Sequence, residues 1–140
     1  MYPLINLLER LGIDARSGRA KVKKNVVVAL ADSDAAAGVL KWLNNTGHTI
    51  YVSLILNVTT KSTAACTVDA GVGNGAASND TLIDGLDVGT AAIVGGSLTT
   101  AGVNGKAFKK VLAGEYVVVS KATGAAAGLV GKAIIEYMEE

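Results

Sequence analysis

The sequence predicts an all-β protein: an antiparallel β-sandwich of jelly-roll type, with about eight strands and a short helical or extended N-terminal arm. Half of the 140 residues are hydrophobic but only 4% are aromatic, so Val, Ile, Leu and Ala must form the core. Seventeen glycines against one proline indicate many turns. From Val22 onward, apolar residues recur with a period of two between turn signals, which is typical of strands with one buried face.

The segment 48–60, HTIYVSLILNVTT, is the clearest predicted strand. Its apolar and polar residues alternate, which is the period expected of a half-buried strand. Ile55 is the exception, because it shares a face with the polar residues. The predicted inward residues are Ile50, Val52, Leu54, Leu56 and Val58, and the predicted outward residues are Tyr51, Ser53, Asn57 and Thr59.

Further strands follow from the same pattern. The segments 65–72 and 127–138 repeat the alternation of inward and outward residues. The segments 23–31 and 114–122 are richer in β-branched residues, which predicts strands that are more deeply covered. Weaker candidates for strands are the segments 38–43, 90–95 and 106–112.

Residues 71–76, GVGNGA, match the glycine fingerprint of a dinucleotide-binding loop. Such a loop must lead into a helix whose N-terminal N–H groups hold the pyrophosphate. The residues that follow, 77–91, contain two further glycines and no apolar stripe at helical spacing. We therefore expect Gly71 to close a strand and the following residues to form a long connection between strands. The residues expected to pin this connection to the body are Leu82, Ile83, Leu86 and Val88.

The N-terminal arm, residues 1–21, differs from the sandwich predicted for residues 22–140. Its four leucines recur at the spacing of one helical face, Pro3 suits a first helical turn and Gly12 suits a stop. A helix this short needs a surface to pack on. It could fold back on its own body or dock on a neighbouring subunit. Residues 14–21 are expected to form a polar connector.

Charge divides the chain in a similar way. Residues 1–24 carry six basic and two acidic side chains, a net charge of +4, whereas the rest carries seven basic and ten acidic side chains, a net charge of −3. A basic arm can bind acidic surfaces or nucleic acid, although a solvated linker has the same composition. The candidate partner-binding residues are Leu4, Leu7, Leu8, Leu11, Arg10, Arg16, Arg19, Lys21, Lys23 and Lys24.

No residue pattern points to catalysis, to a cofactor or to a metal. Cys66 and His48 are the only residues of their kinds, so neither a disulfide framework nor a His-containing triad can form within one chain. Asp84 and Asp87 lack the ligand spacing of a calcium loop, which predicts turn and capping roles. The lysines within residues 106–110 lack an aromatic stacking platform, which argues against specific nucleic-acid binding. We also expect no membrane span and no secretory signal peptide.

Three segments carry recurring motifs: KWLNNTGHTIYVSLILNVTTKSTAACTVDAGVG, NDTLIDGLDVGTAA and GEYVVVSKATGAAAGLVGKAIIEYM. The motifs are W-x-N-N before a long strand, V-T-T at its end, T-V-D-x-G-V, L-I-D-G-x-D-V-G and G-L-V-G-x-A-x-I-E-Y. Together they resemble small jelly-roll structural proteins of tailed bacteriophages and prophages, which decorate or cement the head or form the base of head fibres. The resemblance spans residues 22–138.

This resemblance implies a virion protein without catalytic residues, commonly a homotrimer on the capsid surface, made in the bacterial host cytoplasm. Its implied partners are further copies of itself and the major capsid protein. The arm lies outside the matched region, and we expect it to contact the major capsid protein or neighbouring protomers. The alternative is a carbohydrate- or receptor-binding module of a phage fibre, which would need exposed aromatic residues such as Trp42.

Overall fold

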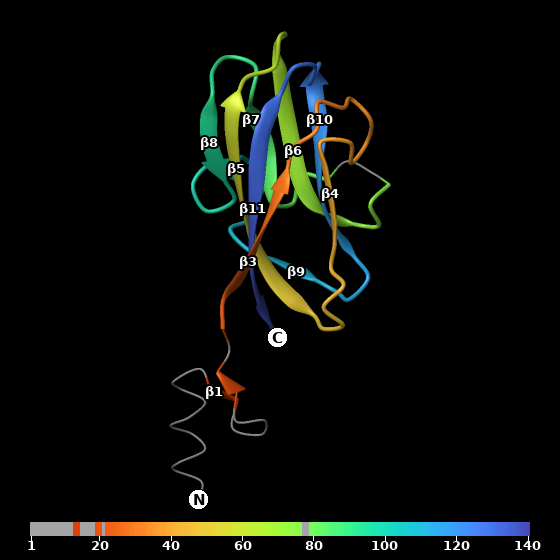
Figure 1. The fold of residues 1–140 in the computed structure, drawn as a ribbon, viewed down its shortest axis with the longest axis vertical. Coiled ribbons are helices and arrows are strands. Elements are labelled where there is room, and N and C mark those ends of the chain that lie inside the picture. Colours follow the sequence, from red (N-terminus) through yellow and green to blue (C-terminus); the bar gives the residue numbers. More distant parts are fainter. Residues whose placement is uncertain (1–12, 15–18, 21, 77–78) are drawn as a thin grey trace, which may run out of the picture.

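Two antiparallel sheets packed face to face form the body of the protein (Figure 1). The computed structural model describes residues 13–14, 19–20, 22–76 and 79–140, and no helix lies among them. The front sheet contains, in order, β3 (Lys24–Ala29), β11 (Val130–Glu139), β5 (Ile50–Thr60) and β8 (Ile93–Gly96), with β9 (Lys109–Val111) also paired to β5. The back sheet contains, in order, β4 (Leu40–Leu43), β10 (Tyr116–Gly124), β6 (Cys66–Gly73) and β7 (Ile83–Asp87).

The strands of the sandwich pair in a nested order. The first, β3, pairs with the last, β11; β4 pairs with β10; β5 pairs with β8 and β9; and β6 pairs with β7. β8 and β9 act as one interrupted strand, because they pair with different parts of β5. Nested antiparallel pairing of eight strands in two sheets is the jelly-roll arrangement. The predicted fold class is therefore confirmed.

The core lies between the two sheets and consists of aliphatic side chains. All five residues predicted to face inward from β5 are buried. Of the four predicted to face outward, Tyr51 and Thr59 are exposed, Asn57 is partly exposed and Ser53 is buried. Burying one such Leu, Ile or Val side chain stabilises the fold by about 1.5–3 kcal/mol. The other strands contribute, among others, Leu40, Cys66, Val68, Ala70, Ile83, Leu86, Val111, Val117, Val119, Ala133 and Ile135.

The two β-branched strands differ in burial. Val117, Val118 and Val119 of β10 are fully buried, so the expectation of deep cover is confirmed there. For β3 it is wrong, because Val27 is 54% exposed. Two things differ: β10 is an inner strand with the loop 32–38 over its outer face, whereas β3 forms the edge of the front sheet. β-branched content favours a strand but does not say how many of its faces are covered.

Two segments of the chain itself, residues 32–38 and 79–81, cover part of the outer face of the back sheet. In the loop 32–38, the Ala37 N–H donates to the buried Ser120 Oγ at 2.7 Å. In the second segment, Asn79 and Thr81 lie against Gly71. A Cβ on Gly71 would come within 2.5 Å of the Asn79 Cβ, so glycine is needed there for the loop to approach the strand.

Two expectations for the region after residue 70 are wrong. Gly71 does not close a strand, because β6 continues to Gly73. The segment 83–87 is not a plain connection but the edge strand β7, paired with β6. Propensity rules do not predict this strand, because Asp and Gly are rare in strands and the segment contains two aspartates and Gly85, which has a φ of 77°. The pinning residues Leu82, Ile83, Leu86 and Val88 are buried, as expected.

The buried Asn44 joins two turns at the lower end of the sandwich. Its Nδ2 donates to the carbonyl oxygens of His48 at 2.9 Å, Leu112 at 3.1 Å and Val111 at 3.2 Å. Its Oδ1 accepts hydrogen bonds from the Thr46 N–H and Oγ1. One side chain therefore satisfies the backbone of the turn before β5 and of the turn between β9 and β10.

We expect Asn44→Ala to lower the free energy of unfolding by about 2–4 kcal/mol, because it leaves several partly buried carbonyl groups without a donor. The neighbouring Asn45 is exposed, so Asn45→Ala should change stability by less than about 0.5 kcal/mol. Urea unfolding followed by circular dichroism measures both variants. Equal effects of the two substitutions would show that Asn44 is not the structural link described above.

Candidate interaction surface

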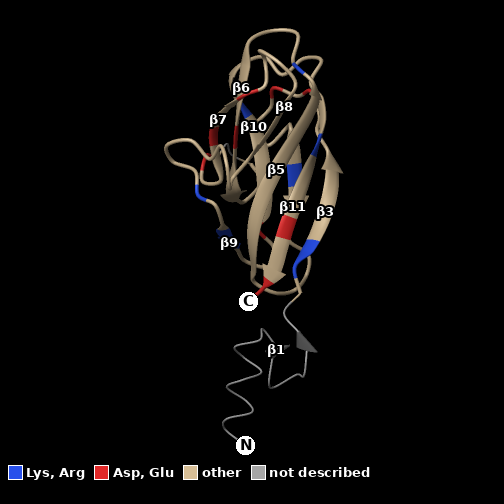
Figure 2. Cartoon of the chain, turned by 90° about the vertical axis from the view of Figure 1, so that its left-hand side faces the viewer, with Lys and Arg blue, Asp and Glu red and all other residues tan. Residues whose placement is uncertain are grey.

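The chain enters the sandwich at the edge of the front sheet, through residues 22–24. The Lys23 ammonium forms an ion pair with the Glu136 carboxylate, and the Lys24 Nζ lies 3.1 Å from the Glu139 Oε1. Both glutamates belong to β11, and Figure 2 shows the basic start of β3 beside the acidic positions of β11. Exposed pairs of this kind contribute little stability, typically about 0–1 kcal/mol. The entry into β3 is set by the backbone pairing of Lys24 with Tyr137, and the two ion pairs lie beside it.

A third ion pair lies at the same end of the sheet. The Lys110 Nζ is 3.0 Å from the Glu140 Oε1, and the Tyr51 hydroxyl donates to the same carboxylate oxygen at 3.0 Å. The hydrogen bond to Glu140 raises the pKa of Lys110 above its ordinary value. The lower end of the front sheet is therefore lined by paired charges.

Above these charges, an apolar row crosses the outer face of the front sheet. Val27, Ile134 and Ile55 lie opposite one another on β3, β11 and β5, so their side chains share this face. Val27 is 54% exposed, and the two isoleucines are partly exposed. We call these three residues the outer row. The outer row arises because each of these strands has an apolar residue at an outward-facing position: Val27 in β3, Ile134 in β11 and Ile55 in β5.

Most exposed apolar side chains within strands lie on this sheet. Eleven large hydrophobic residues of the described part of the chain are exposed, and six of them lie within strands. One of the six, Leu43, belongs to the back sheet. The five on the front sheet are Val27, Tyr51, Val94, Val130 and Met138.

The structure places only part of the predicted arm. Lys23 and Lys24 lie on the sandwich, each beside a glutamate, as described above. Arg19 lies in β2 (Arg19–Ala20), which pairs with β1 (Ile13–Asp14). Part of the expected polar connector is thus a short two-stranded ladder. The remaining candidates, Leu4, Leu7, Leu8, Leu11, Arg10, Arg16 and Lys21, lie outside the described residues.

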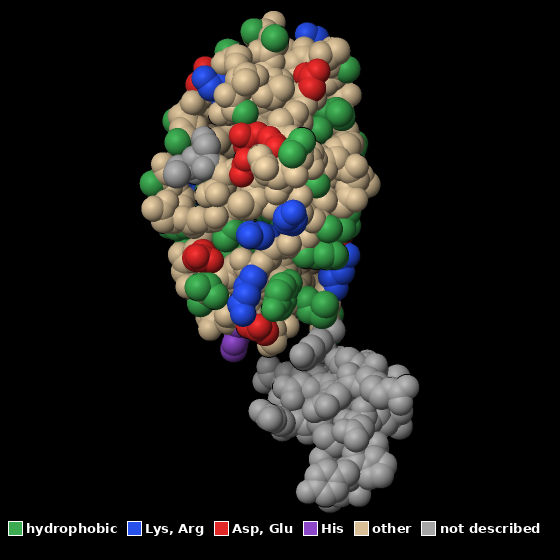
Figure 3. Space-filling view, turned by 180° about the vertical axis from the view of Figure 1, so that it is seen from behind, with side chains coloured by type: hydrophobic (Ala, Val, Ile, Leu, Met, Phe, Trp, Pro, Cys, Tyr) green, Lys and Arg blue, Asp and Glu red, His purple; other side chains and the backbone are tan. Residues whose placement is uncertain are grey.

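A group of carboxylates occupies the opposite side of the molecule, where Figure 3 shows acidic side chains close to lysines. Asp69 accepts a hydrogen bond from the Gly85 N–H at 2.8 Å. Asp84 and Asp80 accept from the backbone and side-chain nitrogens of Asn104 at 3.1 and 3.0 Å. Burial raises the pKa of Asp69, and the nearby Asp84 and Asp80 raise it further. The group holds the loop 101–105 in place, a role that no local sequence pattern revealed.

Asp87 has the turn role expected of it. Its carboxylate accepts hydrogen bonds from the Gly89 N–H, the Thr90 N–H and the Thr90 hydroxyl. The bond from the Thr90 hydroxyl is the main reason why the pKa of Asp87 is lowered. Within the described ranges, no group of three His, Cys, Asp or Glu side chains is placed to hold a metal ion.

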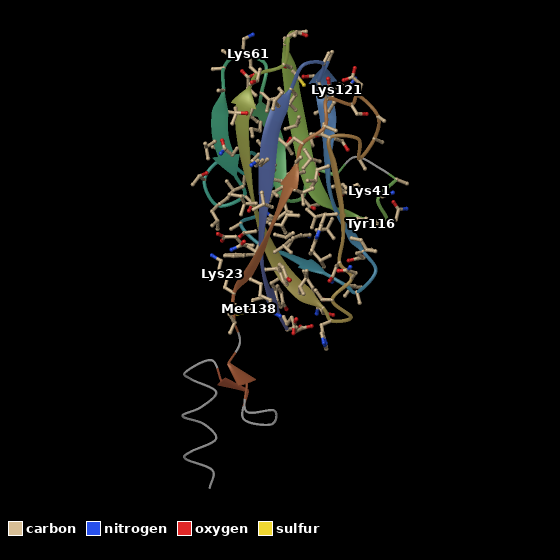
Figure 4. All side chains as sticks on the ribbon, in the orientation of Figure 1. Lys23, Lys41, Lys61, Tyr116, Lys121 and Met138 are labelled. Atoms are coloured by element: carbon tan, nitrogen blue, oxygen red, sulfur yellow. The ribbon has the colours of Figure 1, made fainter. Side chains whose placement is uncertain are left out.

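The single-copy residues have structural surroundings. Cys66 is 3% exposed in the core, and burial raises the pKa of its thiol. Trp42 packs on Tyr137, with ring centroids 5.8 Å apart, and is half-buried against the core. Lys41 lies over the ring of Tyr116, with its Nζ 4.8 Å from the ring centroid (Figure 4). Trp42 therefore does not present an open aromatic face for a sugar.

Phe108 lies among Lys106, Lys109 and Lys110 in the sequence and is 58% exposed. Of the three lysines near it, Lys110 is paired with Glu140.

Comparison with protein-family models, with curated proteins and with solved structures gives no match. The described residues contain no helix with the length and hydropathy needed to cross a bilayer.

We expect Asp69→Asn to change how stability depends on pH. Because the pKa of Asp69 is raised, the folded protein binds this proton at a higher pH than the unfolded chain, and wild-type stability falls as pH rises through that range. The amide introduced by the substitution keeps an acceptor for the Gly85 N–H but cannot ionise. The stability of the variant relative to wild type should therefore increase from about pH 3 to pH 7, measured by urea unfolding.

Asp87→Asn is the control, and its effect should have the opposite sign. The lowered pKa of Asp87 stabilises the wild type above the ordinary range of an Asp, and this contribution disappears as pH falls. Asp87→Asn should therefore lose stability relative to wild type as pH rises. The same trend with pH in both variants would contradict the assignment.

Proposed function

We propose that this protein is a non-enzymatic structural protein of a tailed-phage virion that decorates or stabilises the capsid. The observation that supports this most is the nested jelly-roll pairing, because this is the fold that the resemblance of residues 22–138 implies. In this role the protein is a homotrimer on the capsid surface, made in the bacterial host cytoplasm. It needs no cofactor, no membrane and no specific nucleic acid.

The proposal divides the work between the two parts of the chain. The sandwich forms the bulk on the capsid surface. The arm, residues 1–21, contacts the major capsid protein or a neighbouring protomer through its leucines and basic residues. The pairing of β3 with β11 from Lys24 onward supports this division, because it sets the point where the arm joins the sandwich. Weak arm contacts repeated over a symmetric lattice add through multivalency.

Deletion of residues 1–20 tests the proposal. We expect the truncated protein to keep the β-sheet circular dichroism of the full chain. It should also lose at least about tenfold in co-sedimentation with undecorated capsids, because one set of contacts is missing at every lattice position. Capsid binding equal to that of the full chain would contradict the role of the arm.

A charge-matched pair of variants separates arm-specific contacts from general electrostatics. Arg16→Gln/Arg19→Gln removes two charges from the arm. Lys61→Gln/Lys121→Gln removes two from the upper end of the sandwich, far from where the arm enters (Figure 4). The arm variant should bind capsids more weakly and respond less to salt, whereas the control should bind like wild type. An equal loss in both would point to net charge alone.

A further inference from the structure

We propose that residues 1–12 dock, through their leucine stripe, on the outer row of the front sheet of a copy of this chain. The inference rests on the proposed function in one respect, the binding role of the arm. It adds the surface on which the arm docks. Four features of the molecule lead to it.

The first feature is the difference between the two outer faces of the sandwich. Residues 32–38 and 79–81 lie over part of the back sheet, and Val118 of this face is fully buried. On the front sheet, Val27 is 54% and Met138 is 42% exposed. Among the described residues, the strand positions with exposed large apolar side chains are thus concentrated on the front sheet.

The second feature is a match in size and chemistry. The outer row crosses three adjacent strands, so it is about 10 Å long at the usual strand spacing. Leu4, Leu7, Leu8 and Leu11 follow one helical face, and at 1.5 Å per residue they also extend about 10 Å. Both surfaces are purely aliphatic. A short amphipathic segment needs such a surface to be stable.

The third feature is the tether. Ile13 pairs with Ala20, so the start of β1 lies next to the end of β2. Val27 follows Lys24 by three residues on the same strand, which is about 10 Å of extended chain. The edge strand that supplies Val27 is therefore the element that the arm joins.

The fourth feature is the fixed entry point. The backbone pairing of Lys24 with Tyr137 holds the start of β3 against β11, which supplies Ile134, and the ion pairs of Lys23 with Glu136 and of Lys24 with Glu139 lie at the same place. The arm thus starts beside the outer row. A helix delivered there reaches the row of its own copy, and in an oligomer it reaches the row of an adjacent copy.

Site-specific thiol labelling of the full chain tests the inference. Val27→Cys reports the outer row, and Val103→Cys, at a position 90% exposed on a distant loop, reports free solvent access. Cys66 is 3% exposed and adds only a slow background. An arm bound about 90% of the time should slow labelling at position 27 about tenfold relative to position 103.

Two charge-matched arm variants complete the test. Leu7→Asp/Leu8→Asp places two carboxylates in the leucine stripe and should restore labelling at position 27 to within about twofold of position 103. Asn6→Asp/Ser17→Asp adds the same charge outside the stripe and should leave the protection intact. Protection that disappears on dilution assigns the arm to a neighbouring copy, and protection independent of concentration assigns it to its own copy; both support the inference.

Two results would overturn it. One is rapid labelling at position 27 that Leu7→Asp/Leu8→Asp does not change. The other is protection that this variant does not release, which would mean that something else covers the row. Co-sedimentation of the same variants with capsids separates this inference from the proposed function. If position 27 of the otherwise unchanged chain is labelled rapidly but Leu7→Asp/Leu8→Asp weakens capsid binding, the docking site is wrong and the proposed function stands. If position 27 is protected but the chain does not bind capsids, the proposed function is wrong and the docking site stands.

Discussion

The pairing of β5 with β11 is the contact on which the rest of the molecule depends. It runs along the whole of β11, and every other strand of the front sheet attaches to one of these two: β3 to β11, and β8 and β9 to β5. The same two strands supply many of the inward side chains that the back sheet packs against. Ile55 and Ile134, which lie opposite each other, are far apart in sequence. Pairing them closes a long loop of chain, which costs conformational entropy. The free energy of packing the two sheets together offsets this cost, so the core and the strand pairing form together.

Much of this fold follows from the sequence, because a strand with one buried face alternates with a period of two. That rule located β5, β6 and β11 and the faces they bury. It failed for β7, because Asp84, Gly85 and Asp87 are residue types that are rare in strands. The two aspartates serve other purposes: Asp87 accepts hydrogen bonds in a turn and Asp84 anchors a loop. It also failed for the burial of β3, because local sequence does not say whether a strand is inner or edge. The hydrogen bonds of Asn44 and of Asp69, Asp80 and Asp84 were not predicted for a related reason: most of their partners are distant in sequence.

The glycines of GVGNGA illustrate how a motif depends on its surroundings. A dinucleotide loop and this segment both use glycine because a side chain would prevent close approach. In this protein the approaching group is the chain's own loop, with Asn79 against Gly71 and the Tyr116 ring next to Gly75. The outcome is a back face that is partly covered by the chain itself, and this makes the two faces different. On the back sheet Val118 and Ser120 are fully buried, while the outer face of the front sheet presents valine and isoleucine.

The nested strand order also gives the sandwich two different poles. Because the first strand pairs with the last, the start of β3 lies opposite the end of β11, with Lys24 facing Tyr137. Any chain that precedes or follows the sandwich therefore leaves from this lower pole (Figure 1). The upper pole consists of turns, among them the turn 125–129 between β10 and β11, which Asp34 and Asp32 hold through the N–H groups of Ala126 and Gly128. A peptide inserted into an upper turn would point away from everything joined at the lower pole, which makes this fold a polar scaffold for display.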